Sequence, residues 1–159
     1  MWQISSYSLI PIAIVVVAIP LMPMLAQNNR FSHLNLALGF DRATAIVMGY
    51  TGGSYSLSSI VNQDRHGNPC IGYGDPEPDH SMVLENDFPR LTIQIDSGGK
   101  DTTLIVRGPE RQNIRCGFAH NESRDAVVDD INWQAGTYEI WVGSMKPNQN
   151  SPYRLSVRQ

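Results

Sequence analysis

The segment around residue 77 places three carboxylates close together in the sequence. Asp75, Glu77 and Asp79 alternate with two prolines, and calcium favours several hard oxygen ligands on a flexible loop. The segment lacks the Asp-x-Asp-x-Asp-Gly spacing of the familiar calcium loop, and the prolines restrict how the carboxylates converge. These residues are therefore weak calcium candidates, and we expect a solvated turn that holds no metal.

Two tryptophans and a glutamate form a candidate ligand-binding surface. In residues 137–142, strand alternation places Tyr138 on one face and both Glu139 and Trp141 on the other. If the Tyr138 face meets the core, Trp141 is partly exposed beside Glu139. An exposed indole next to a carboxylate can stack on a sugar ring and bind its hydroxyls, and Trp133 is a second candidate. The alternative is that both indoles pack in the interior, because large aromatic side chains stabilise by burial.

The histidines do not form a catalytic pattern. His33, His66, His80 and His120 are scattered through the chain, without a second histidine or a cysteine at ligand spacing. The sequence also lacks a Gly-x-Ser-x-Gly elbow, an HExxH motif and a glycine-rich phosphate loop. We therefore predict no enzyme activity and no cofactor, although a site assembled from distant residues remains an alternative.

The chain has two cysteines, Cys70 and Cys116. In an oxidising compartment this count leaves one connectivity, so we predict a disulfide between them. The alternative is a redox or metal-binding pair, which would be expected to use CxxC spacing.

The charge pattern excludes some partners. Twelve basic and fifteen acidic residues give a net charge of −3, with both signs scattered along residues 27–159. Nucleic-acid binding calls for a clustered basic face, and binding to anionic lipid calls for a basic patch. Neither partner is expected.

The amino-terminal segment resembles a secretory signal. Residues 7–26 carry no charged side chain, and the small residue Ala26 is followed by a polar stretch. We predict a signal peptide over residues 1–26 and a periplasmic or secreted protein. The alternative is an uncleaved membrane anchor with the domain outside the cytoplasm, because about 20 apolar residues can cross a bilayer.

The remainder of the chain has the period of β-strands. Apolar and polar residues alternate in residues 91–95, 104–107 and 153–158, and further strands are expected in residues 43–48, 54–60, 81–85, 113–118 and 137–142. Glycine and proline occupy the breaks between these runs. The pattern predicts an all-β protein, an antiparallel β-sandwich like a jelly roll, over residues 42–159. Residues 27–41 are expected to form a linker or a first edge strand. Residues 62–80 form a long break that would be the main functional loop if the domain has one.

The carboxy-terminal half resembles a known family. The stretches 101–109 (DTTLIVRGP), 115–117 (RCG), 133–144 (WQAGTYEIWVGS) and 153–157 (YRLSV) are similar to bacterial pre-peptidase C-terminal domains and their stand-alone secreted relatives. The resemblance implies a jelly-roll-like sandwich without a catalytic centre. Phe118-Ala119 stands where many relatives have an acidic pair, so a calcium site is not carried over.

Together these observations predict an exported, non-catalytic binding or structural module of the cell envelope or extracellular space. Its partner would be a glycan or a protein of the envelope or exterior. A membrane-anchored subunit of a larger assembly and a small secreted hydrolase are the alternatives.

Overall fold

The computed structural model describes Trp2, residues 32–119 and residues 123–159. The predicted signal or anchor segment therefore lies outside the described residues, apart from Trp2. Within the described part of the chain, no helix has the length and apolar character needed to cross a membrane.

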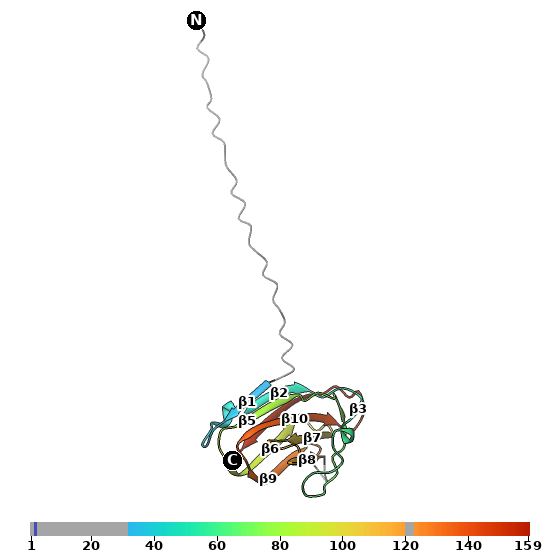
Figure 1. Ribbon diagram of the computed structural model, residues 1–159. Coiled ribbons are helices and arrows are strands. Elements are labelled where there is room, and N and C mark those ends of the chain that lie inside the picture. Colours follow the sequence, from blue (N-terminus) through green and yellow to red (C-terminus); the bar gives the residue numbers. More distant parts are fainter. Residues whose placement is uncertain (1, 3–31, 120–122) are drawn as a thin grey trace.

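The chain folds into two β-sheets that pack face to face (Figure 1). The elements in chain order are β1 (Ser32–Leu36), η1 (Arg42–Thr44), β2 (Ile46–Tyr50), β3 (Tyr55–Ser56), η2 (Leu57–Ser59), β4 (Tyr73–Gly74), β5 (His80–Leu84), β6 (Phe88–Asp96), β7 (Thr102–Arg107), β8 (Ile114–Phe118), β9 (Val127–Trp133), β10 (Gly136–Ser144) and β11 (Pro152–Arg158). The larger sheet runs β1-β5-β10-β7-β8, and the short strands β4 and β3 join it at the end of β10. The smaller sheet has the order β2-β11-β6-β9. The predicted all-β sandwich is confirmed.

The core lies between the two sheets and follows the predicted alternation. In β6, Leu91, Ile93 and Ile95 are buried, whereas the residues between them face outward. In β11, Tyr153, Leu155 and Val157 do the same. Side chains that alternate in this way cover one face of each strand with apolar area, which is the main stabilising term of a sandwich.

The pairing is not antiparallel throughout. β1 and β5 are parallel, with Ser32 opposite His80 and Leu36 opposite Leu84. Two other expectations were also wrong in detail. Residues 54–60 form the two-residue strand β3 followed by the short helix η2, and the strand expected from residue 43 begins at Ile46, after η1. The strand β9 was not predicted.

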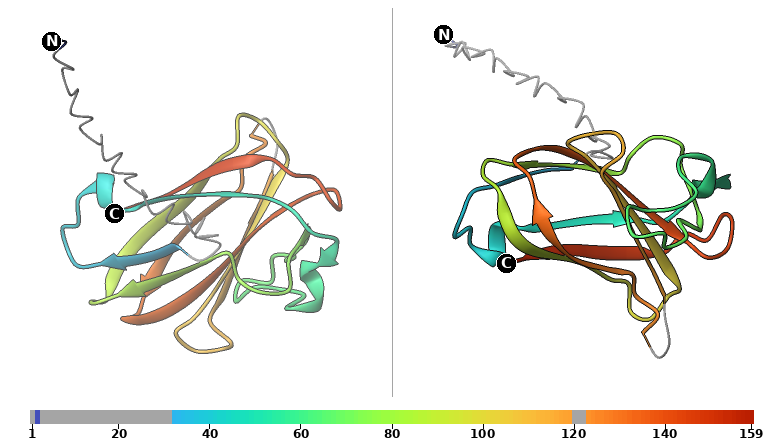
Figure 2. Two further views of the ribbon diagram at one scale, coloured as in Figure 1. Left: turned by 90° about the horizontal axis from the view of Figure 1, so that it is seen from above. Right: turned by 60° about the horizontal axis from the view of Figure 1, so that its bottom comes forward.

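The long loop between η2 and β5 covers the outer face of the larger sheet at β7, β8 and the second half of β10. A second apolar cluster forms there, and its members are Leu57, Cys70, Ile105, Ile114 and Trp141. The helix η2 packs closely on β10 at Gly143, where a Cβ would lie 2.6 Å from Leu57 Cδ1. Figure 2 shows these loops gathered at one end of the sandwich. As a result, β10 is buried on both faces.

The predicted disulfide is present. Cys70 in the loop is bonded to Cys116 on β8, and their Cα atoms are 5.3 Å apart. Asp64 supports the same connection, because its carboxylate accepts hydrogen bonds from the amides of His66, Asn68 and Cys116. The loop is therefore fixed to the strand beneath it.

Replacing both cysteines, as Cys70→Ala/Cys116→Ala, should lower the free energy of unfolding by about 4 kcal/mol, because the bond closes a loop with a sequence separation of 46. Urea unfolding under oxidising conditions measures the difference. A reducing agent should produce a similar loss in the unmodified protein and none in the double variant. Equal stability of the two oxidised proteins would contradict the prediction.

Candidate ligand-binding site

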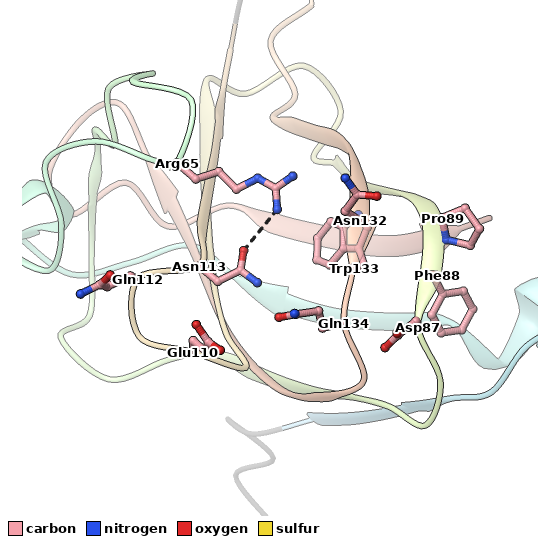
Figure 3. A pocket seen from close by; sticks show the side chains of 10 residues that line it. All are labelled: Arg65, Asp87, Phe88, Pro89, Glu110, Gln112, Asn113, Asn132, Trp133 and Gln134. Atoms are coloured by element: carbon pink, nitrogen blue, oxygen red, sulfur yellow. Dashed lines mark hydrogen bonds between the residues drawn. The ribbon is translucent and has the colours of Figure 1, made fainter.

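A polar pocket of about 710 Å³ opens between the β7–β8 turn, the end of β9 and the start of β6. Four segments that are far apart in the sequence line it (Figure 3): Arg65 from the long loop; Asp87, Phe88 and Pro89 at the start of β6; Glu110, Gln112 and Asn113 from the β7–β8 turn; and Asn132, Trp133 and Gln134 at the end of β9. Its volume lies within the range of roughly 300–1,000 Å³ that is usual for small-ligand sites.

A buried arginine organises this edge of the molecule. The side chain of Arg115 is 1% exposed, and its guanidinium lies 3.9 Å from the centroid of a Trp133 ring. Its Nε donates to Asp130 Oδ2 at 2.8 Å, and its Nη2 donates to the carbonyl of Asn132 at 3.1 Å. Burial and the charge of Arg65 lower the pKa of Arg115. A buried guanidinium is tolerated only when its charge and its donors are satisfied in this way.

Asp130 is shared by two arginines. Its Oδ2 lies 3.2 Å from Arg65 Nε as well as accepting from Arg115, and its Oδ1 lies 3.2 Å from His66 Nε2. Burial alone would raise the pKa of Asp130, but the Ile131 amide and the two arginines hold it below its ordinary value. The loop that carries Arg65 is thus tied to β9 by charge as well as to β8 by the disulfide.

Asn113 is held in one orientation by the same arginines. Its Oδ1 accepts from Arg115 Nη1 at 2.8 Å and from Arg65 Nη1 at 3.4 Å. Because these donors occupy the amide oxygen, the Nδ2 group is directed into the pocket as a donor. Figure 3 shows Asn113 facing Gln134 across the pocket, with its oxygen toward Arg65.

The backbone of Asn132 explains how Trp133 enters the core. Asn132 has a φ of 57°, a left-handed conformation that asparagine adopts more readily than most residues. The change interrupts the alternation of β9, so that Asn132 is exposed and Trp133 is buried. Trp133 Nε1 donates to the carbonyl of Asp130 at 3.0 Å. The indole therefore forms the floor of the pocket.

The tryptophans are not the exposed surface that strand alternation predicted for Trp141. Trp133 is 1% exposed and Trp141 is 2% exposed. The long loop covers Trp141, whose Nε1 donates to the carbonyl of Pro76 at 3.2 Å. Glu139 accepts from Arg107 Nη2 at 2.7 Å, and the Arg107 guanidinium lies 4.7 Å from a Trp141 ring centroid. The exposed indole that would stack on a sugar beside Glu139 is therefore missing from this face.

The acidic loop is drawn onto β10 rather than around an ion. Asp79 Oδ2 accepts from the amide of Val142 at 2.8 Å, while Asp75 and Glu77 are exposed. Among the described residues, no three acidic, histidine or cysteine side chains converge in a way that would hold a metal ion.

Three of the four histidines lie in different surroundings, and His120 lies outside the described residues. His66 borders Asp130, and His80 is buried with its Nε2 at 2.8 Å from the Tyr153 hydroxyl. His33 on β1 contacts Ser81 on β5 through Nδ1. Ser81 and His33 lie on the open face of the sheet, away from the pocket.

The sequence interpretation missed Arg115, Asp130 and Asn113. Asp129 and Asp130 lie within β9, where Asp129 pairs with Arg90 and Asp130 pairs with Arg65 and Arg115. Alternation gives no signal for Arg115, because Ile114, Cys116 and Phe118 form the apolar phase of the expected strand and Arg115 lies in the polar phase. In the structure that polar phase faces the core, since Arg115 is opposite Val106.

No family model matches the chain, and no curated protein matches it. The chain is similar to the pre-peptidase C-terminal domain of collagenase from Bacillus anthracis, with 14% sequence identity and a TM-score of 0.46, over 80% of this chain and 95% of that chain.

The titrations of Asp79 and His80 should have opposite effects on the stability of the fold, and these effects should cancel over a range of pH. Burial raises the pKa of Asp79 from 3.8 to about 7 and lowers that of His80 from 6.5 to about 4. Between about pH 4 and 6.5, the unfolded chain carries one proton on the imidazole and the folded chain carries one on the carboxyl. The two states bind equal numbers of protons, so the pair adds no slope.

Single substitutions should reveal the two opposite slopes. In Asp79→Asn, only the unfolded histidine binds a proton, so stability should fall as the pH decreases from 6.5 to about 4. In His80→Gln, only the Asp79 carboxyl of the folded state binds a proton, so stability should rise as the pH decreases from about 7 to about 4. Urea unfolding at several pH values measures both, relative to the unmodified protein. Parallel profiles for the two variants would contradict the assignment.

Proposed function

We propose that this protein is a non-catalytic binding module of the cell envelope or extracellular space, and that the pocket between the β7–β8 turn and the end of β9 is its binding site. Its partner is a glycan or a protein found there. The proposal rests on the orientation of Asn113. Two arginines hold its amide oxygen, so that its amide donor points into the pocket. A polar group that is fixed before the ligand arrives lowers the entropic cost of binding.

The pocket is lined mainly by side chains that bind through hydrogen bonds. Its seven polar side chains are four carboxamides, which donate and accept hydrogen bonds but do not transfer protons near neutral pH, two carboxylates and one guanidinium. The carboxamides are those of Gln112, Asn113, Asn132 and Gln134. No histidine, serine or cysteine is among the residues that line this pocket.

Two features support the proposed compartment. The disulfide between Cys70 and Cys116 is of the kind that persists where thiols oxidise. The uncharged segment at residues 7–26 has the composition of an export signal. The partner would therefore be met outside the cytoplasm.

The substitution Asn113→Asp tests the pocket without dismantling it. A carboxylate accepts from both arginines at least as well as an amide oxygen does, so the unfolding midpoint should stay equal or rise. The donor into the pocket is lost, however. Retention of purified protein on envelope and surface material from its own host should therefore fall at least tenfold, as measured by quantitative pull-down.

Asn35→Asp is the matched control, because Asn35 is exposed on β1 and lies outside the pocket. It makes the same chemical change and should leave retention unchanged. The proposal fails if the unmodified protein is not retained, or if Asn113→Asp and Asn35→Asp are retained equally well.

A further inference from the structure

We infer that the ligand of this pocket is a neutral saccharide, recognised by its hydroxyl groups. The inference rests on the proposed function and narrows its ligand class. A hydroxyl donates one hydrogen bond and can accept two, so a site that offers both donors and acceptors suits it. The pocket provides this combination, with the Asn113 donor and the Glu110 carboxylate on the wall formed by the β7–β8 turn and the Asp87 carboxylate on the other side, before β6.

The charges disfavour an acidic ligand. Two carboxylates and a single guanidinium line the pocket. The guanidinium of Arg65 is already engaged, since Nε meets Asp130, Nη1 meets Asn113 and Nη2 donates to the Ile131 carbonyl at 3.0 Å. Three of the five N–H donors of Arg65 are thus used within the protein, which weakens its capacity to bind a carboxylate or a phosphate with a parallel pair of donors.

The backbone at the pocket disfavours an extended peptide. A peptide adds to a sheet through the free carbonyls and amides of an edge strand. At the end of β9, the Ile131 and Asn132 carbonyls accept instead from Arg65 and Arg115. Asn132 also departs from strand geometry. The edge is therefore closed to strand addition at this point.

The buried aromatic side chains at the floor of the pocket leave no cavity for an apolar side chain of a ligand. Phe88 and Trp133 are each 1% exposed, and Arg115 covers one face of the indole. Binding must then come from hydrogen bonds with the pocket walls. Carboxylates and carboxamides arranged around a polar, open pocket of about 710 Å³ suit one or a few sugar rings.

The test uses two arrays, one of neutral and uronic-acid oligosaccharides and one of unmodified linear peptides, followed by calorimetry with any oligosaccharide that binds. The unmodified protein should bind neutral oligosaccharides and neither of the other classes. Asn113→Asp should weaken this binding at least tenfold, and Asn35→Asp should not change it.

A second pair of variants examines the acceptors. Asp87→Asn/Glu110→Gln keeps the shape of the pocket but replaces charged acceptors with neutral ones, so affinity for the neutral saccharide should fall at least tenfold. Asp87 Oδ1 accepts from the Ala135 amide at 2.7 Å, a bond that an asparagine oxygen can keep. The matched control, Glu77→Gln/Asp96→Asn, removes the same charge at exposed positions outside the pocket.

The outcomes separate the two proposals. Binding only to peptides, only to acidic saccharides, or to neither array overturns the saccharide inference, while loss of envelope retention in Asn113→Asp still supports the binding module. Binding to a neutral saccharide that neither pocket variant weakens overturns both the inference and the assignment of the pocket.

Discussion

The candidate site depends on the need to neutralise one buried guanidinium. Arg115 lies between the two sheets, where its charge has almost no access to water. The surrounding structure meets this need with a carboxylate, an amide oxygen, two backbone carbonyls and the face of an indole. Each of these partners comes from β9 or from the turn before β8. Satisfying the arginine therefore also positions the residues that form the pocket.

The residues that line the pocket come from four segments that are far apart in the sequence and meet at this edge of the sandwich. Arg65 arrives on a loop fixed by the disulfide at Cys70, and it uses the same carboxylate as Arg115. The loop is thus attached to β8 by the disulfide and to β9 by the ion pair between Arg65 and Asp130. These anchors add to the backbone hydrogen bonds within the loop, and its order gives the pocket a wall.

Much of the fold follows from local patterns in the sequence, whereas the site does not. Alternation in β6, β7 and β11 predicts their inward faces, and the cysteine count predicts the disulfide. β9 escapes this reasoning because Asn132 interrupts its alternation. Trp141 was expected on an exposed face because alternation cannot reveal that a distant loop will cover it. The Arg115–Asp130 pair is equally hidden, since it arises from two strands that meet only across the edge of the sandwich.

The order of the strands also has a consequence for synthesis. β10 pairs with β4, β5 and β7, and β11 joins β2 to β6. The middle of each sheet is therefore made last, at residues 136–158. A nascent chain that lacks these residues has strands without a centre to join, and long-range pairing of this kind forms slowly. Both sheets therefore depend on residues 136–158 for their completion, because a chain cut before residue 136 lacks the strand that joins β5 to β7 and the strand that joins β2 to β6.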